Sequence, residues 1–165
     1  MRAILLVLIL AGAAAAIQAD SGDLPWPAFT VIDASGTPTS SAAFASGGRA
    51  VVVFVKPSCR PCTQLLTALS SLEAAGLASQ LVVVVEADAD AAAKFEARSL
   101  PQPLAGARVF ADAEGTGWST LELHGLPVVF GVEFNRIAWT HVGAPERPLL
   151  ESLIRTWATS PGARR

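Results

Sequence analysis

Two cysteines, Cys59 and Cys62, are separated by two residues and follow shortly after the apolar run Ala50 to Val55. A continuous β-branched run of this kind predicts a central strand that is covered on both faces. Four leucines at helical spacing follow the cysteines: Leu65, Leu66, Leu69 and Leu72. We therefore expect the pair to lie where a buried strand passes into a helix that runs to Gly76.

The pair is better suited to chemistry than to stapling the fold. The chain has only two cysteines, and a disulfide across so short a loop restrains little of the unfolded chain. A helix N-terminus stabilises a thiolate on Cys59, and Lys56 and Arg60 add positive potential. Pro61 is tolerated in the first helical turn. We expect Cys59 to attack a disulfide and Cys62 to resolve the mixed disulfide.

Two cysteines with this spacing also occur as half of a zinc site, which needs four ligands. The other soft candidates, His124 and His141, lie far along the chain, and their spacing fits no compact zinc pattern. We expect no metal and no cofactor beyond the redox-active disulfide. His124 is a candidate for proton transfer near the cysteines, the alternative being a polar loop residue; His141 is expected to be structural.

The remaining patterns alternate between strand and helix. They predict a second buried strand over 81–85, a helix over 89–98, a short strand over 107–111, a hairpin of strands over 128–132 and 136–141, and a closing helix over 148–158. No repeat or long linker divides them, so residues 20–165 are expected to form one α/β domain.

Residues 1–19 have the pattern of an export signal, with Arg2, an apolar core and small residues up to Ala19. Cleavage is expected after Ala19, with Ala16 as a second choice; an uncleaved membrane anchor is the alternative. Either outcome places the domain outside the cytoplasm, in the periplasm or an equivalent compartment. The net charge of −2 argues against nucleic acid as a partner.

The run VVVFVKPSCRPC, the later HGLPVVF and the strand ending HVGA resemble the thioredoxin superfamily. The middle section, from VVVVEADADAAAKF to ARVFADAEG, is most similar to TlpA/ResA-type periplasmic redoxins, and PAFTVIDASGTPTS resembles their N-terminal hairpin. The resemblance covers roughly residues 25–158. It implies a thioredoxin-like three-layer α/β sandwich: a central mixed sheet flanked by helices, with an N-terminal β-hairpin and an inserted strand–helix unit.

The same resemblance implies the roles of two further residues. Pro127 matches the cis-proline that faces the disulfide, and the backbone of Leu126 matches the residue that pairs with the substrate chain. The implied partners are client protein thiols or disulfides and a membrane electron donor, acting on a monomer. Proline before Cys62 resembles the reducing members, so we expect a protein disulfide reductase.

Three other functions stay open. An oxidase or isomerase for one client protein uses the same chemistry. A copper-binding metallochaperone is the second, although such relatives space their cysteines by three residues. A peroxiredoxin-like peroxidase is the third, but Ser58 and Arg60 do not recreate its threonine-rich pocket.

The sequence departs from the family at three places. Ser58 stands where most members have tryptophan, and Pro57 before it is unusual. Val53 stands where thioredoxin has a buried acid that manages the proton of the second cysteine. Glu86 and Asp88 replace that acid only if the fold brings them close.

Overall fold

The computed structural model describes residues 24–46, 48–72, 77–143 and 146–159. The expected export signal and the expected helix stop at Gly76 lie outside these residues. The strands are β1 (Leu24–Pro25), β2 (Thr30–Ile32), β3 (Pro38–Ser40), β4 (Arg49–Val55), β5 (Leu81–Val85), β6 (Arg108–Ala111), β7 (Val128–Glu133) and β8 (Arg136–Val142). The helices are α1 (Arg60–Ser70), α2 (Leu77–Gln80), α3 (Ala89–Ser99), α4 (Thr116–Thr120) and α5 (Arg147–Thr159), with 3₁₀ turns η1 (Ser41–Ala43) and η2 (Gln102–Leu104).

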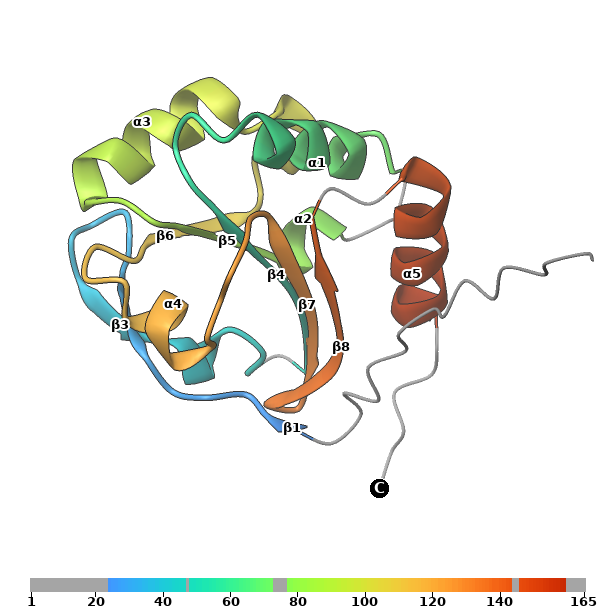
Figure 1. Cartoon of the computed structure of the whole chain (residues 1–165), viewed down its shortest axis with the longest axis horizontal. Helices are drawn as coiled ribbons and strands as arrows, with labels where there is room; N and C mark the ends of the chain where they lie inside the picture. The colour runs from blue at the N-terminus through green and yellow to red at the C-terminus, as the bar shows by residue number, and fades with distance from the viewer. Residues whose placement is uncertain (1–23, 47, 73–76, 144–145, 160–165) are drawn as a thin grey trace, which may run out of the picture.

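All eight described strands form one mixed sheet in the order β1-β8-β7-β4-β5-β6-β2-β3 (Figure 1). β4, β5 and β6 are parallel neighbours, and the other pairs are antiparallel. The hairpin of β2 and β3 lies at one edge, beside β6. The expected α/β architecture is confirmed: a mixed sheet flanked by helices, with the N-terminal hairpin attached.

β4 lies between β5 and β7 and is buried on both faces. Alternate side chains point to opposite faces of a strand. Val51, Val53 and Val55 therefore join one hydrophobic cluster, whereas Val52 and Phe54 join the other. Burial on both sides explains why this segment is continuously apolar rather than alternating.

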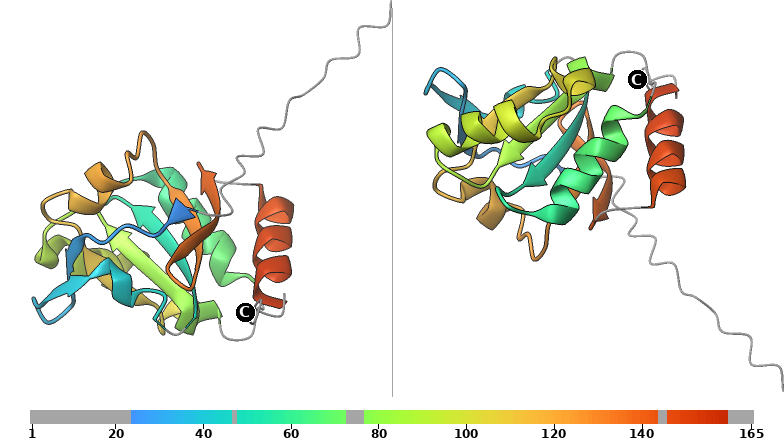
Figure 2. Two further views of the ribbon diagram at one scale, coloured as in Figure 1. Left: turned by 90° about the horizontal axis from the view of Figure 1, so that it is seen from below. Right: turned by 90° about the horizontal axis from the view of Figure 1, so that it is seen from above.

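Three helices cover one face of the sheet. α1, α3 and α5 each contribute buried apolar side chains to the cluster that contains Val53: Leu65, Leu66 and Leu69 from α1, Ala92 and Phe95 from α3, and Leu150, Ile154 and Trp157 from α5. Seen from above, α1 and α3 lie in front of the sheet (Figure 2). Among the described residues, no helix is long and apolar enough to span a membrane.

The opposite face is covered by an aromatic cluster. Each ring lies 5.0–6.3 Å, centroid to centroid, from at least one neighbouring ring, and the rings come from Trp26, Phe29, Phe44, Phe54, Phe110 and Phe130. The N-terminal segment, η1 and the short α4 carry this layer (Figure 2). The buried hydroxyl of Ser41 ties it together, donating to the Pro27 carbonyl at 2.8 Å and accepting from the Phe29 amide at 2.9 Å.

α1 is shorter than the leucine spacing predicted. The helix ends at Ser70, and the amide of Ser71 bonds to the carbonyls of Ala68 and Leu69. Leu72 lies beyond the helix but is still buried in the same cluster, so its place in the leucine pattern reflects burial rather than helix. The expected continuation of α1 beyond Ser70 was therefore wrong.

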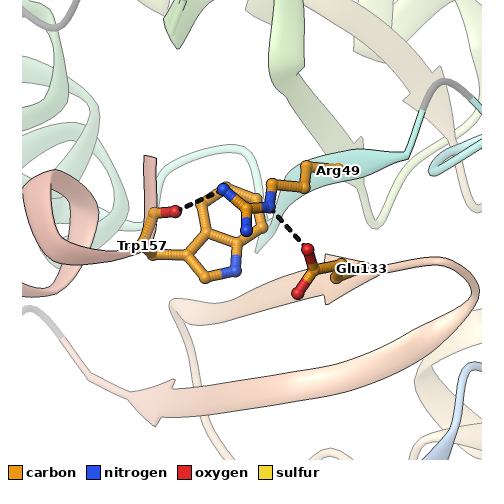
Figure 3. A network of polar contacts seen from close by, with 3 residues as sticks. All are labelled: Arg49, Glu133 and Trp157. Carbon is orange, nitrogen blue, oxygen red and sulfur yellow. Dashed lines mark hydrogen bonds and ion pairs between the residues drawn. The ribbon is translucent and has the colours of Figure 1, made fainter. Parts of the chain in front are cut away.

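A polar network joins α5 to the sheet (Figure 3). Arg49 begins β4, and its Nε donates to Glu133 at the end of β7 at 2.8 Å. Another guanidinium nitrogen donates to the Trp157 carbonyl at 2.8 Å, and the guanidinium carbon lies 5.5 Å from the centre of the Trp157 ring. One side chain thus links two strands and the last helix through an ion pair, a hydrogen bond and a cation–π contact.

Candidate active site

Cys59 and Cys62 are joined by a disulfide at the start of α1. The S–S bond is 2.06 Å long and the two Cα atoms are 5.2 Å apart. Cys59 is the N-cap of the helix, and its sulfur accepts a hydrogen bond from the Cys62 amide at 3.2 Å. A first-turn amide and the positive end of the helix are thus directed at the Cys59 sulfur, where they favour negative charge.

The two sulfur-bearing residues differ sharply in exposure. Cys62 is 0% exposed and belongs to the cluster beneath α1, whereas Cys59 is half-buried at its margin. Pro61, between them, lies in the first turn of α1, where no helical partner exists for the amide it lacks. A reactant from solvent therefore reaches Cys59 and not Cys62.

A tight turn carries the chain from β4 to Cys59. The Cys59 amide donates to the Lys56 carbonyl at 3.2 Å, so Pro57 and Ser58 are the two central residues. Ser58 has a φ of +65°. Proline at the second position followed by a positive φ at the third defines a type II turn, which favours glycine at the third. Pro57 fits this turn, whereas Ser58 occupies a conformation that is strained for a residue with a Cβ atom.

Replacing Ser58 with glycine is expected to stabilise the oxidised protein by about 0.5–1 kcal/mol. Relief of the left-handed conformation contributes about 1–2 kcal/mol, and the greater freedom of glycine in the unfolded chain offsets part of it. The measurement is urea unfolding of the variant and the wild type. Ser58→Ala keeps the Cβ atom and should show no gain; an equal gain in both variants would contradict strain at this position.

The Leu126–Pro127 loop lies at the same edge of the sheet as the cysteines. β4 and β7 are antiparallel with Phe54 opposite Val128, so the end of β4 and the start of β7 are neighbours. The Leu126–Pro127 peptide bond is cis. Pro127 is buried, and its carbonyl accepts from the Gly143 amide at 2.7 Å.

Leu126 itself precedes the β7 ladder. Its side chain is half-buried against both hydrophobic clusters. Within the described residues, the backbone amide and carbonyl of Leu126 have no hydrogen-bond partner. The loop thus presents a backbone segment with unused hydrogen-bonding groups beside a fixed turn.

Of the charged side chains near the cysteines, some have partners and one has none among the described residues. The Lys56 ammonium lies 3.1 Å from a carboxylate oxygen of Glu86, which follows β5. Asp88 caps α3, accepting from the Ala91 amide at 2.7 Å. Arg60 is exposed, and no partner for its guanidinium lies among the described residues. The positive potential that the sequence assigned to Lys56 and Arg60 is therefore partly neutralised at Lys56 by Glu86.

The sequence offers two candidate replacements, Glu86 and Asp88, for the acid missing at Val53. Val53 and Cys62 are both fully buried in the same hydrophobic cluster. Glu86 and Asp88 are occupied with Lys56 and with α3. Neither therefore stands free as a substitute.

The two histidines lie in different settings. His124 is exposed and makes no side-chain contact with a polar group among the described residues. His141 is half-buried in β8, opposite Val129, and burial lowers its pKa below the usual value for histidine. In the part of the chain that the structure describes, no three His, Cys, Asp or Glu side chains gather to hold a metal ion.

Solved structures of bacterial thiol–disulfide proteins resemble this chain closely in shape. A putative thiol:disulfide interchange protein DsbE from Chlorobium tepidum superposes with a TM-score of 0.68 at 22% identity, covering 83% of this chain and 97% of that one. A secreted Mycobacterium tuberculosis disulfide oxidoreductase homologous to E. coli DsbE gives 0.60 at 22% identity, with 78% and 95% covered.

A putative thioredoxin from Neisseria meningitidis gives 0.65 at 19% identity, with 87% and 95% covered. No family model and no curated protein matches the chain. At these identities the likeness concerns the fold, and it confirms the thioredoxin-like fold expected from the sequence.

Proposed function

We propose that this chain, which has the thioredoxin fold, is an exported thiol–disulfide oxidoreductase that reduces disulfides of client proteins. One arrangement supports this function above all. The Cys59–Cys62 disulfide caps α1 with Cys59 accessible and Cys62 buried, at the sheet edge that also holds the Leu126–Pro127 loop.

The first step begins from the reduced pair. The Cys59 thiolate attacks one sulfur of a client disulfide, forming a mixed disulfide and releasing the other client sulfur as a thiolate that takes up a proton. The helix N-terminus and the Cys62 amide stabilise the thiolate before attack. The unpaired backbone of Leu126 holds the client chain in strand fashion next to Pro127.

The second step releases the client. Cys62 loses its thiol proton and attacks the Cys59 sulfur of the mixed disulfide, and the second client sulfur leaves as a thiol after protonation. The client has gained two electrons and two protons, and the Cys59–Cys62 disulfide is formed. A dithiol donor must then return two electrons to the protein. We propose that this donor is a membrane protein, and that the chain acts as a monomer.

Export is supported by the pattern of residues 1–19 and by the settings of proteins with the same fold. One solved neighbour is described as secreted and another, from Streptococcus pneumoniae, as an exposed lipoprotein thioredoxin. We propose that residues 20–165 form one domain that works in the periplasm or an equivalent space, released by cleavage after Ala19 or held by an uncleaved N-terminus.

The reduction potential of the Cys59–Cys62 pair tests this function. We expect a value closer to that of thioredoxin, about −270 mV, than to that of the strong periplasmic oxidants, about −120 mV. The protein is equilibrated in thiol–disulfide buffers and its free thiols are alkylated and counted by mass. In a parallel assay with dithiothreitol as donor, reduction of a protein disulfide should exceed the dithiothreitol background.

The two readouts separate the possible failures. A potential near −120 mV would reverse the proposed direction and favour the oxidase for one client. No acceleration of exchange in either direction would contradict the oxidoreductase itself.

A further inference from the structure

Arg60 lies between the two cysteines in the chain, and its guanidinium has no ion-pair or hydrogen-bond partner among the described residues. It is the first residue of α1, directly after Cys59, and its side chain is exposed. The other nearby cation, Lys56, is paired with Glu86 at 3.1 Å. Asp88, the next carboxylate after Glu86, is bonded to the Ala91 amide. The described surroundings thus leave one free positive charge beside the accessible sulfur.

The geometry of a mixed disulfide places the client chain next to this charge. Disulfide-bonded Cα atoms lie about 5.5–6 Å apart, and the residues on either side of the client cysteine lie about 3.8 Å farther along its chain. Arg60 is the neighbour of Cys59 in the chain, and its side chain is long enough to span the distance from Cys59 to a residue next to the client cysteine. A client residue that flanks the reacting cysteine is therefore within reach of the Arg60 guanidinium.

The Leu126–Pro127 loop and the end of β8 supply mainly apolar groups at this edge, and the exposed His124 precedes them in the chain. Leu126 and Pro127 are apolar, and Val142, at the end of β8, is 63% exposed. The Gly143 amide is used by the Pro127 carbonyl. Arg60 directly follows Cys59 and is therefore the charged side chain best placed to discriminate between client sequences, whereas Leu126 offers clients only backbone groups that all sequences can pair with.

We propose that Arg60 is a specificity-determining residue that selects clients with an aspartate or glutamate beside the reacting cysteine. This inference rests on the proposed oxidoreductase function and adds a client class to it. An exposed ion pair of this kind corresponds to about a two- to fivefold preference in kcat/KM at low ionic strength. The preference should shrink as salt screens the charges.

The test uses two disulfide peptides that differ only in a Glu or a Gln next to the reacting cysteine. Wild-type protein and Arg60→Gln are assayed with both peptides, with dithiothreitol as donor. The measured quantity is the Glu-to-Gln ratio of kcat/KM, because a general change in Cys59 reactivity cancels in this ratio. We expect the wild-type ratio to exceed that of Arg60→Gln about two- to fivefold, and the difference to fall in high salt.

Arg98→Gln is the matched control. Arg98 lies in the last turn of α3, at the end opposite the cysteine edge, and its substitution should leave the ratio at the wild-type value. Equal ratios in wild type and Arg60→Gln would overturn the selection while leaving the oxidoreductase intact. A ratio that drops equally in Arg98→Gln would also overturn it, by showing an effect of net charge. No exchange with either peptide would instead contradict the proposed function.

Discussion

Replacing Cys62 with alanine is expected to stop exchange at the mixed disulfide, leaving Cys59 covalently joined to a disulfide peptide. The accessible sulfur is retained, but the buried sulfur proposed to resolve the intermediate is gone. Turnover should fall to the background of the donor thiol, and about one peptide per protein should remain attached. Mass spectrometry without reductant measures the adduct, and its loss on adding dithiothreitol identifies it as a disulfide.

The matched variant Cys59→Ala separates the roles of the two cysteines. Its remaining thiol is 0% exposed beneath α1, so a peptide disulfide should react with it far more slowly. Adducts of equal rate and yield in the two variants would contradict the assignment of Cys59 as nucleophile. The Cys59→Ala/Cys62→Ala double variant should form none, which controls for attachment through other groups.

Replacing Gly131 with alanine is expected to destabilise the protein by about 3 kcal/mol, the largest stability effect among these predictions. A Cβ atom at this position of β7 would lie 2.1 Å from Nε1 and 2.3 Å from Cε2 of Trp139. That indole lies on the face of the sheet that the helices cover, where it contacts Trp157 edge-on with the ring centres 6.1 Å apart. Displacing the Trp139 ring would disturb its contact with Trp157 of α5. Urea unfolding of the oxidised protein measures the loss.

Gly106→Ala is the matched control for this prediction. Its added Cβ would meet only the Ala78 side chain, at an ordinary 3.6 Å, so the change should stay within about 0.5 kcal/mol. Adding Trp139→Ala to Gly131→Ala should make the combined loss smaller than the sum of the two single losses. A Gly131→Ala protein as stable as wild type would contradict the close contact between this glycine and Trp139.

The central strands and the cysteine site were predictable because their signals are local. β4 and β5 are read from apolar runs that coincide with strands buried on both faces, and the step from β4 into α1 places Cys59 at a helix start. The leucine pattern overestimated the length of α1. Leu72 is buried beyond the end of the helix, and a buried leucine at this spacing cannot be distinguished in the sequence from one more helical position. The short α2 has no periodic pattern and was not expected.

The remaining features depend on residues that meet only in the folded chain. Arg49 joins Glu133 and Trp157 across long stretches of sequence, and no local pattern pairs them. Lys56 was expected to add positive potential beside Cys59, but the parallel pairing of β4 and β5 places Glu86 against it. The positive φ of Ser58 could not be predicted from the residue type, because serine does not favour this conformation. The proline before it does indicate a turn.

The sheet order also constrains when the fold can be completed during synthesis. β4 acquires its parallel neighbour β5 soon after α1, but its other edge waits for β7, which begins only at Val128. Until then a strand of six apolar residues keeps an open row of hydrogen-bonding groups, the form in which strands pair with other chains. α5, which packs on the face of the sheet that carries Val51, Val53 and Val55, is synthesised later still. Chains cut short before Glu133 should therefore aggregate rather than persist as partly folded domains.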